Sequence, residues 1–315
     1  MSFYIPEEYE LRLQQELPDI HSVGYVLRHK KSGARVCLVE NDEENKVFSI
    51  GFRTPPTDNT GVAHIVEHTT LCGSEKYPAK DPFVELVKGS LNTFLNAMTF
   101  PDKTIYPVAS CNDKDFANLM SVYMDAVFHP NMYRNEKLFK QEGWHYELES
   151  VDAPLTYNGV VYNEMKGAYS SPDEVLSAAT GKLLFPDNTY SMESGGFPPE
   201  IPELTYEGCL AFHRSYYHPC NSYIYLYGNM DMEERLRYMD AEYLSKYDEI
   251  EINSEIPLQK ALDSVKTKDA YYGITEDEKE DHNTYYQWSR VLGECRDKVK
   301  YYADQVLEDV LLHSS

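Results

Sequence analysis

The stretch Gly61-Val-Ala-His64-Ile-Val-Glu67-His68-Thr-Thr-Leu71 decides how this chain of 315 residues is interpreted. On a helix that advances about 100° per residue, His64 and His68 project about 40° apart, and Glu67 projects about 60° to the side of His64. Two imidazoles and one carboxylate therefore share one face of an apolar segment. The order is the inverted, H-x-x-E-H form of a zinc motif. The stretch predicts a zinc site with His64 and His68 as ligands and Glu67 as the base.

A third ligand is expected on a second helix, since a zinc site that works on a water molecule takes three protein ligands and this motif supplies two. The segment Asn158-Gly-Val-Val-Tyr-Asn-Glu164-Met-Lys-Gly167 offers an acid, Glu164, within an apolar face. That face is formed by Val160, Val161 and Met165. Taken alone, an exposed glutamate without a metal is the commoner outcome. The other acids nearby lie in a more polar stretch and are weaker candidates: Glu142, Glu147 and Glu149.

Long segments spread over nearly the whole chain carry a family resemblance. They are His64-Ile-Val-Glu67-His68, His68-Thr-Thr-Leu-Cys72-Gly-Ser, Gly89-Ser-Leu-Asn-Thr-Phe-Leu-Asn96-Ala-Met-Thr-Phe-Pro-Asp-Lys-Thr104-Ile-Tyr-Pro107, Tyr157-Asn-Gly-Val-Val-Tyr-Asn-Glu164-Met-Lys-Gly167, Ser194-Gly-Gly196, Phe212-His-Arg-Ser-Tyr-Tyr-His-Pro219 and Tyr227-Gly-Asn229. They resemble the insulinase/pitrilysin family of zinc peptidases, in its branch of presequence proteases and falcilysin. The resemblance implies that Glu164 is the third ligand of one Zn²⁺. It also implies that Asn96 and Ala97 belong to an edge strand that binds the substrate backbone.

The remaining pattern predicts an α+β fold. Alternation and turn residues predict strands at 21–30, 34–40, 46–53, 91–99, 104–110 and 221–228. Apolar periodicity predicts helices at 82–89, 113–128, 135–148, 174–183, 205–216 and 231–244. Strands interleaved irregularly with helices favour an antiparallel sheet with helices packed on one face. The resemblance implies the same architecture, a LuxS/mitochondrial-processing-peptidase-like metallohydrolase module.

The composition changes near residue 246, which suggests three regions. Residues 1–246 form the expected zinc-binding peptidase module, and residues 247–282 form an acidic linker region. Residues 283–315 begin a second, incomplete module, with a strand expected at 283–292 and a helix at 295–312. About 70 residues cannot complete another copy of a unit of about 240. The chain is therefore interpreted as an N-terminal fragment.

The motif and the resemblance together predict a zinc-dependent endopeptidase that hydrolyses unstructured oligopeptides. A zinc-activated water would attack the peptide carbonyl, with Glu67 as general base, while the substrate lies extended beside Asn96-Ala-Met-Thr99. The resemblance also implies that the C-terminal half of the full-length enzyme completes the chamber, so the fragment alone is expected to be inactive. The unfinished apolar elements of residues 283–312 predict self-association of the fragment.

Two other function classes stay open. A non-catalytic peptide-binding subunit would be expected to show a decayed motif, whereas the motif here is intact. A metal-dependent lyase of the S-ribosylhomocysteine-cleaving type also carries H-x-x-E-H, but it takes a cysteine as third ligand and is a much smaller protein. Metal analysis after substitution of Glu164 or of Cys111 would separate the lyase from the peptidase.

Composition limits the remaining possibilities. The chain has 29 Lys and Arg against 52 Asp and Glu, a net charge of −23, so we expect no nucleic-acid binding and some attraction of basic peptides. No apolar run approaches the ~20 residues of a membrane span. The first residues, Met1-Ser-Phe-Tyr-Ile-Pro-Glu-Glu-Tyr-Glu10, lack signal and transit features, so a cytoplasmic location is predicted. The six cysteines lack C-x-x-C spacing and are expected to be free thiols, with Cys72 a packed small residue.

Overall fold

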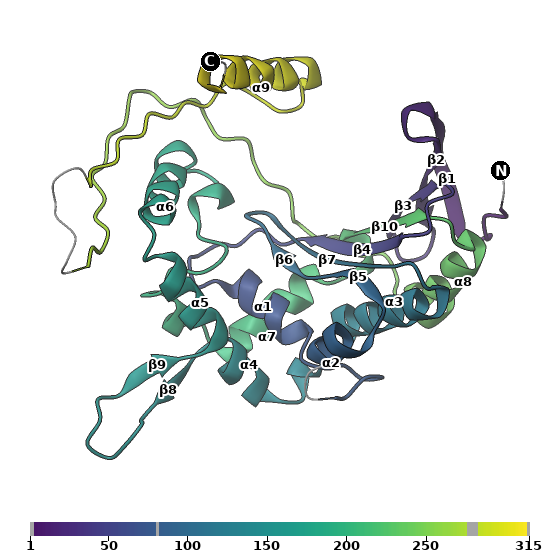
Figure 1. The fold of residues 1–315 in the computed structure, drawn as a ribbon, viewed down its shortest axis with the longest axis horizontal. Helices are drawn as coiled ribbons and strands as arrows, with labels where there is room; N and C mark the ends of the chain where they lie inside the picture. Colours follow the sequence, from purple (N-terminus) through teal and green to yellow (C-terminus); the bar gives the residue numbers. More distant parts are fainter. Residues whose placement is uncertain (1–2, 80–81, 276–282, 314–315) are drawn as a thin grey trace.

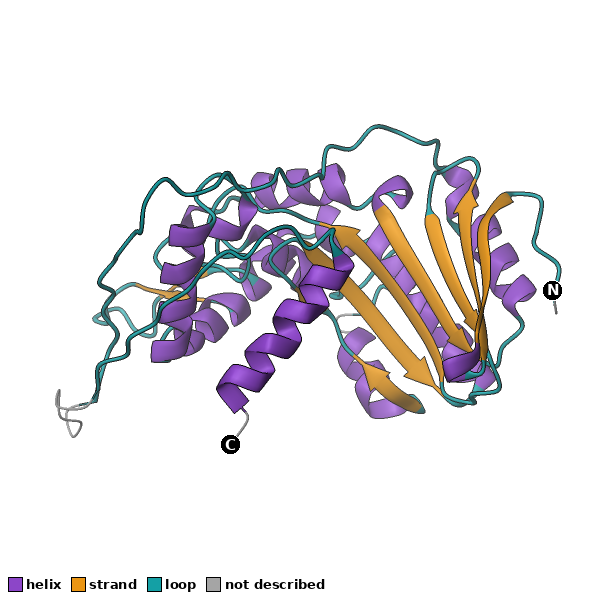
Figure 2. Ribbon diagram, turned by 90° about the horizontal axis from the view of Figure 1, so that it is seen from above, coloured by secondary structure: helices purple, strands orange, loops and turns teal. Residues whose placement is uncertain are grey.

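The computed structural model describes residues 3–79, 82–275 and 283–313. Its main body is an α+β unit in which helices cover one face of a sheet (Figure 1), and Figure 2 looks onto the other face of that sheet. The strands, in chain order, are β1 (Tyr9–Leu17), β2 (Ser22–His29), β3 (Arg35–Glu40), β4 (Lys46–Arg53), β5 (Asn92–Leu95), β6 (Met98–Thr99), β7 (Lys103–Ser110), β8 (His145–Glu147), β9 (Thr156–Asn158) and β10 (Ser222–Gly228).

The sheet is antiparallel except at one pair. Its strand order is β1-β2-β3-β10-β4-β7-β5, and β6 also pairs with β7. In the part of the chain that the structure describes, only β10 and β3 run parallel, and β10 lies between β3 and β4. β8 and β9 form a separate hairpin. The predicted antiparallel sheet with helices on one face is confirmed.

Alternating side chains explain how the sheet meets its helices. In β4, Phe48, Ile50 and Phe52 are buried on the helix side, while Ser49 and Arg53 on the other side are partly exposed. The helices are α1 (Val62–Thr70), α2 (Pro82–Gly89), α3 (Asp113–Phe128), α4 (Glu136–Glu142), α5 (Val160–Ala168), α6 (Pro172–Leu184), α7 (Tyr206–Tyr216), α8 (Met232–Glu242) and α9 (Lys298–His313). None of the helices in the described ranges is long and apolar enough to span a membrane.

The longest core helix shows how the sequence sets an element. Asn112 caps α3, since its side-chain oxygen accepts the N–H groups of Lys114 and Asp115. The buried face of α3, which includes Phe116 and Tyr123, packs against β4 and β7. The core therefore lies between the sheet and the helices on its covered face.

Several predicted elements need correction. The helix expected over 135–148 ends at Glu142, and the chain then turns into β8. The strand expected over 91–99 is interrupted at Asn96 and Ala97, which lie between β5 and β6. The strand expected over 283–292 is absent, since those described residues are extended chain with no strand pairing. β1, β8 and β9 were not predicted.

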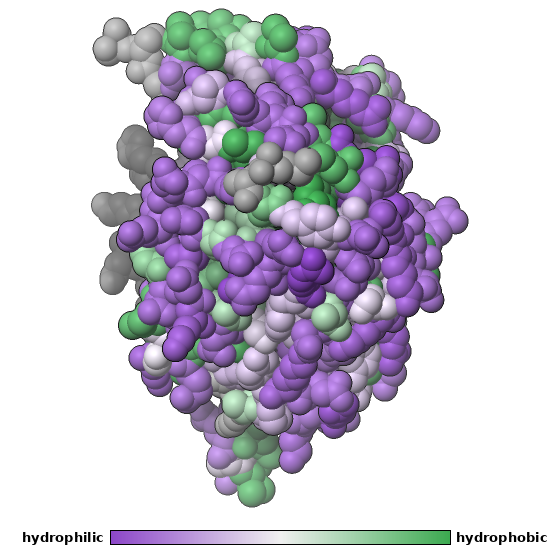
Figure 3. Space-filling view, turned by 90° about the vertical axis from the view of Figure 1, so that its right-hand side faces the viewer, coloured by the Kyte–Doolittle hydropathy of each residue, from purple (hydrophilic) through white to green (hydrophobic). Residues whose placement is uncertain are grey.

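The C-terminal part of the chain differs from the main body. The described side chains after residue 247 are mostly exposed. The helix expected near 295–312 is α9, which lies apart from the sheet (Figure 1). Figure 3 shows hydrophobic side chains at the top, where α9 lies, and at the bottom, where the β8–β9 hairpin projects. Leu311 and Leu312 in α9 are each 70% exposed, and Val151 in the hairpin is 94% exposed. The three-region division and the self-association stay predictions, and residues 276–282 of the expected linker lie outside the described residues.

Candidate metal centre

The helix that carries the motif is held in place from its first residue. Gly61 precedes α1 with a left-handed backbone, φ 70° and ψ 24°. A Cβ atom there would lie 2.7 Å from the carbonyl oxygen of Gly195 and 2.7 Å from Cα of Gly196. Only glycine tolerates both the backbone angle and this close approach. Helix α1 therefore starts against the backbone of the segment that includes Gly195.

The structure brings the three predicted ligands together from two helices. His64 and His68 lie on α1, and Glu164 lies on α5. Oε2 of Glu164 is 3.7 Å from Nε2 of His64 and 3.8 Å from Nε2 of His68. Among the described residues, these three form the group of His, Cys and acid side chains close enough to share one metal ion.

The environment of Glu164 differs from the expectation that it lies within an apolar face. The side chain of Glu164 is 54% exposed. Val161 and Met165 form the buried side of α5, but Val160 is 44% exposed. Glu164 lies at the border of the buried face, so its carboxylate reaches the two imidazoles without being buried among apolar groups.

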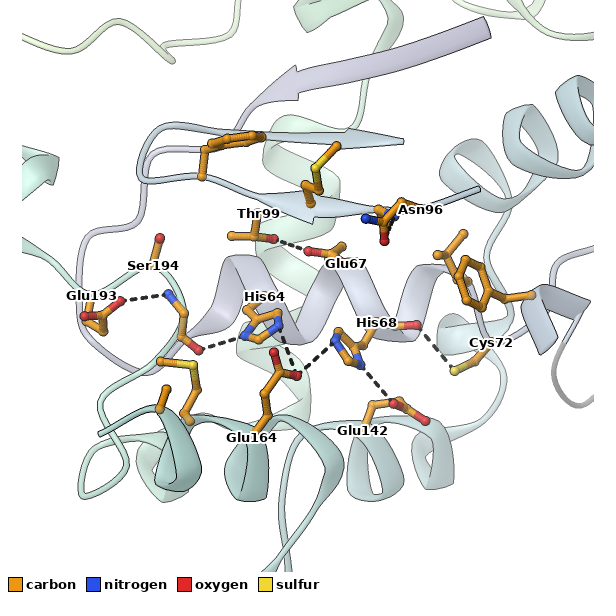
Figure 4. Close-up of a pocket in the computed structure, with 18 of the residues that line it drawn as sticks. His64, Glu67, His68, Cys72, Asn96, Thr99, Glu142, Glu164, Glu193 and Ser194 are labelled. Carbon is orange, nitrogen blue, oxygen red and sulfur yellow. Dashed lines mark hydrogen bonds and ion pairs between the residues drawn. The ribbon is translucent and has the colours of Figure 1, made fainter. Parts of the chain in front are cut away.

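Hydrogen bonds at Nδ1 orient both imidazoles (Figure 4). Nδ1–H of His64 donates to the carbonyl oxygen of Gly195 at 3.0 Å, and Nδ1–H of His68 donates to Oε2 of Glu142 at 3.2 Å. A carbonyl oxygen only accepts, which leaves Nε2 of His64 with the lone pair. The Nε2 atoms of both rings face Glu164. This pattern, one ring nitrogen held by an acceptor and the other directed to a common point, is typical of metal-binding histidines.

The charges around His68 shift the pKa values of the pair. Burial lowers the pKa of His68, but the hydrogen bond with Glu142 and the charges of Glu67, Glu142 and Glu164 outweigh it, so the pKa is raised above its ordinary value. Burial raises the pKa of Glu142, but the hydrogen bond from His68 outweighs it, so this pKa is lowered. Glu142 therefore remains a carboxylate that accepts the Nδ1 proton.

The geometry fits a zinc ion. In a tetrahedral site with bonds of about 2.0–2.1 Å, two ligand atoms lie about 3.3 Å apart. The Nε2 to Oε2 distances of 3.7 and 3.8 Å are within a few tenths of an ångström of that separation. The donor set, two neutral imidazoles and one carboxylate, is also one that zinc prefers when a water molecule completes its coordination. His64, His68 and Glu164 could therefore hold the ion with small side-chain adjustments.

The predicted base lies on the other side of α1 from Glu164 (Figure 4). Glu67 is 7% exposed, and its Oε2 accepts the hydroxyl of Thr99 at 2.6 Å. Thr99 belongs to β6, so a side-chain hydrogen bond joins the base to the short outer strand. Glu67, the three ligands and β6 all line one cavity of about 710 Å³.

The predicted substrate-binding residues also line this cavity. Asn96 and Ala97 lie between β5 and β6 on its wall. The carbonyl oxygen of Asn96 accepts the hydroxyl of Tyr123 at 3.2 Å, and the side-chain oxygen of Asn96 accepts the N–H of Ala97 at 2.9 Å. These bonds fix the interruption between the strands. The role of both residues in binding a substrate stays a prediction.

The two cysteines considered at the sequence level lie in different places. Cys72 lines the cavity, is half-buried, and donates its thiol to the carbonyl oxygen of His68 at 3.4 Å. Cys111 is exposed at the end of β7, where it contacts Asn45 and not the ligands. The thiol of Cys111, expected as a ligand in the lyase alternative, is therefore not part of the group formed by His64, His68 and Glu164.

Three contributors were not assigned from the sequence. Glu142 was weighed only as a weak ligand candidate. In the structure it binds Nδ1 of His68 and is not part of the group of three ligands. Thr99 was placed only in the strand expected beside the substrate, without its bond to Glu67, and Gly195 stood inside a segment quoted for the family resemblance, without a role. The consecutive glycines in Ser194-Gly-Gly196 were the available signal for a close backbone approach.

Comparison with known proteins assigns the family. Residues 47–169 match the family model for insulinase (peptidase family M16), and residues 203–315 match the model for the peptidase M16 inactive domain. Protein HypA of Clostridium perfringens is 53% identical over 301 residues, which cover 96% of this chain and 31% of that protein. Presequence protease 1, chloroplastic/mitochondrial, of Arabidopsis thaliana is 53% identical over 235 residues, or 75% of this chain and 22% of that protein.

Other comparisons agree with this family. The mitochondrial presequence protease of Mus musculus is 45% identical over 250 residues, covering 78% of this chain and 24% of that protein. The crystal structure of pitrilysin shares the fold, with a TM-score of 0.62 and 18% identity over 79% of this chain and 25% of that one. The chain thus spans less than a third of the length of the curated relatives named here. With two family models matched along most of its length, the chain belongs to the insulinase family, peptidase family M16.

Proposed function

We propose that this chain carries the metal centre of a zinc-dependent endopeptidase that acts on unstructured peptides. The observation that carries the proposal is that His64, His68 and Glu164 lie close enough together to share one metal ion. Glu67, on the same helix as the two histidines, lines the same cavity. The names of the matched relatives, presequence proteases, support a peptidase as the class of enzyme.

Each side chain has a separate role in this proposal. When bound at His64, His68 and Glu164, Zn²⁺ supplies a Lewis acid that polarises the scissile carbonyl and makes a water molecule more acidic. Glu67 accepts the proton that this water loses and delivers it to the leaving amine. Thr99 holds one oxygen of Glu67, and so fixes the direction of the other.

The substrate would lie extended along the outer edge of β5 and β6. Among the described strands, β7 is the one that pairs with β5 and β6, so a peptide can add at their other edge as a further strand beside Asn96 and Ala97. The peptide would then pass directly over Glu67, which is bonded to Thr99 of β6. An unstructured peptide suits this binding mode, because a folded protein cannot present a free extended segment.

The alternatives have weaker support. A lyase with a cysteine ligand is not supported, since Cys111 lies at the end of β7 away from the three ligands. A non-catalytic peptide-binding subunit would need neither Glu67 nor its hydrogen bond from Thr99, and both are present. The requirement for a second half of the enzyme stays a prediction, which the isolated chain tests directly.

Zinc binding is the first test. The chain is purified, dialysed, and its zinc content is measured by atomic emission. We expect one Zn²⁺ per chain, and loss of it in His64→Ala. The matched control is His145→Ala, a partly exposed histidine on β8 that is not one of the three grouped ligands. A His64→Ala protein that keeps as much zinc as the parent after dialysis contradicts the assignment.

Loss of activity without loss of zinc is the second test. Glu67→Gln keeps the shape and removes the base, so we expect full zinc content and a loss of peptidase activity of roughly 10²-fold or more. Activity is measured with a quenched fluorescent peptide on the Clostridium perfringens relative with its matched segment replaced by this chain, because the isolated chain is expected to be inactive. Parental turnover by the Glu67→Gln protein contradicts the role of Glu67.

A further inference from the structure

The cavity of the metal centre adjoins a second cavity beside α6. This second cavity has a volume of about 720 Å³, and three residues line both: Glu174, Glu193 and Ser194. We call it the distal arm and define it by its apolar lining residues. These are Pro101, Leu176, Leu184, Phe185, Tyr190 and Met192. The shared residues place the two cavities side by side.

The direction of β6 leads from the metal centre to the distal arm. In Figure 4, Asn96 lies toward the Cys72 end of the site, Thr99 lies toward the opposite end, and Glu193 and Ser194 lie beyond His64 at that opposite end. The next residues of the chain, Phe100 and Pro101, line the first cavity and the distal arm respectively. A peptide that pairs with β6 and continues in the same direction therefore enters the distal arm.

Helix α6 has an apolar side that the main body does not cover. It is 13 residues long, and none of its residues is buried. An amphipathic helix of this length ordinarily buries an apolar stripe against the protein. Leu176 and Leu184, which belong to that side, are only half-buried and face the distal arm. Apolar surface is thus left available inside a cavity that adjoins the metal centre.

We propose that the distal arm is a second subsite of the same binding groove, and that it receives an apolar side chain of an extended peptide several residues from the bond that is cut. The assignment rests on the proposed function. Glu174 and Glu193 stand at the junction of the two cavities, so the stretch of peptide that crosses the junction should carry no acidic residue. The occupant is therefore a peptide with spaced apolar residues and a neutral or basic stretch between them.

Peptide binding to a non-cleaving protein tests the subsite. The chain carries Glu67→Gln and is loaded with Zn²⁺, so that a bound peptide stays intact. The probes are fluorescein-labelled peptides of about 12 residues, which span roughly 40 Å when extended. They consist of Gly, Ser and Lys, and one Phe is placed at each position in turn. Affinity is measured by fluorescence anisotropy.

We expect two separate Phe positions to strengthen binding, one for each cavity. Leu176→Asp should remove the gain at the distal position, by about tenfold, and leave the other gain unchanged. The matched control is Leu148→Asp, because Leu148 is a 54% exposed leucine in the β8–β9 hairpin that lines neither cavity. Ser177→Trp, which fills the distal arm from an exposed position, should act like Leu176→Asp.

A direct measurement does not depend on how the variants fold. Peptides with benzoyl-phenylalanine at the distal position should cross-link to residues 173–192 on irradiation. A single favourable Phe position, an unchanged distal gain in both variants, or cross-links only elsewhere overturns the subsite while the proposed function stands. If the zinc-loaded protein binds none of the peptides, the proposed function fails with it.

Discussion

At the scale of single residues, Thr99 links the base to the strand that would bind the substrate. Its hydroxyl donates to Oε2 of Glu67 at 2.6 Å. Thr99→Val keeps the shape of the side chain and removes the donor. In the Clostridium perfringens relative that carries this chain in place of its matched segment, we expect zinc content to persist and peptidase activity, measured with a quenched fluorescent peptide, to fall about tenfold, the effect of losing one hydrogen bond to a charged group. Thr99→Ser restores the donor and should restore most of the activity. Equal activities of the Val and Ser variants would contradict this role.

Glu142 acts on the metal through His68, which makes its effect measurable without any substrate. It accepts the Nδ1 proton of His68 at 3.2 Å. Glu142→Leu should weaken zinc binding by roughly 10–100-fold, and Glu142→Gln, which keeps an acceptor, by less. Competition with a chromophoric chelator measures both affinities. The matched control is Glu136→Leu on the same helix, where Glu136 pairs with Lys140 at the surface. A loss of affinity in the control as large as in Glu142→Leu would assign the effect to α4 as a whole.

At the scale of elements, local pattern predicted some segments and missed others for identifiable reasons. Helix α1 and strands β2 to β4 were predicted because their periodicity reflects their own burial. β1 was missed, since only Tyr9 of its residues is buried and an edge strand shows no alternation. Helix α4 ends at Glu142, and the next residue, Gly143, has a non-helical backbone (φ −81°, ψ −88°) and lies against Ile65 of α1, a tertiary contact. The apolar pattern at 283–292 suggested a strand, but a strand also requires a hydrogen-bonding neighbour.

The same distinction applies to the candidate site. Helical spacing alone brought His64, Glu67 and His68 together. Glu164 was a candidate because of the residues around it, but it was assigned as a ligand only through the family resemblance. The local sequence of α5 does not determine how far Glu164 lies from α1. The bonds of Thr99 to Glu67 and of Glu142 to His68 were not predicted, because β6 and α4 reach the site only through the packing of the whole core.

The junction between α1 and the Gly195–Gly196 backbone yields a prediction at the element scale. Gly61→Ala would place a Cβ 2.7 Å from the carbonyl oxygen that orients His64. We expect a loss of about 2–4 kcal/mol in the free energy of unfolding, from the left-handed backbone and the clash together. The matched control is Gly167→Ala in α5, where a Cβ meets nothing within 4 Å, so helix propensity should give a gain of about 0.5–1 kcal/mol. Urea denaturation of both variants measures the two effects, and equal losses would contradict the close-packing argument.

At the scale of the whole molecule, one buried histidine joins helices from distant parts of the sequence. His213 on α7 lies with Nδ1 2.8 Å from the hydroxyl of Tyr133, and Nε2–H donates to the carbonyl oxygen of Val127 at the end of α3 at 3.1 Å. Burial lowers the pKa of His213 to about 3, opposed by the hydrogen bond to Val127 and assisted by the charge of Arg214. The folded protein therefore keeps this imidazole neutral, because protonation would leave a charge in the core.

This depressed pKa makes global stability depend on pH in a defined direction. The unfolded chain takes up a proton at His213 below about pH 6.5, whereas the folded chain does so only near pH 3. The contribution of His213 is therefore fully present above pH 6.5 and is lost as the pH falls toward 3, by about 1.4 kcal/mol per pH unit. His213→Gln offers an uncharged donor and acceptor, so the variant should be less stable than the parent at pH 7.5 but should lose less stability between pH 6.5 and 5. Urea denaturation across this range gives both slopes, and the difference between them isolates His213 from the carboxylates and from His68. Parallel slopes for parent and variant would mean that His213 takes up its proton at the same pH in the folded and unfolded states.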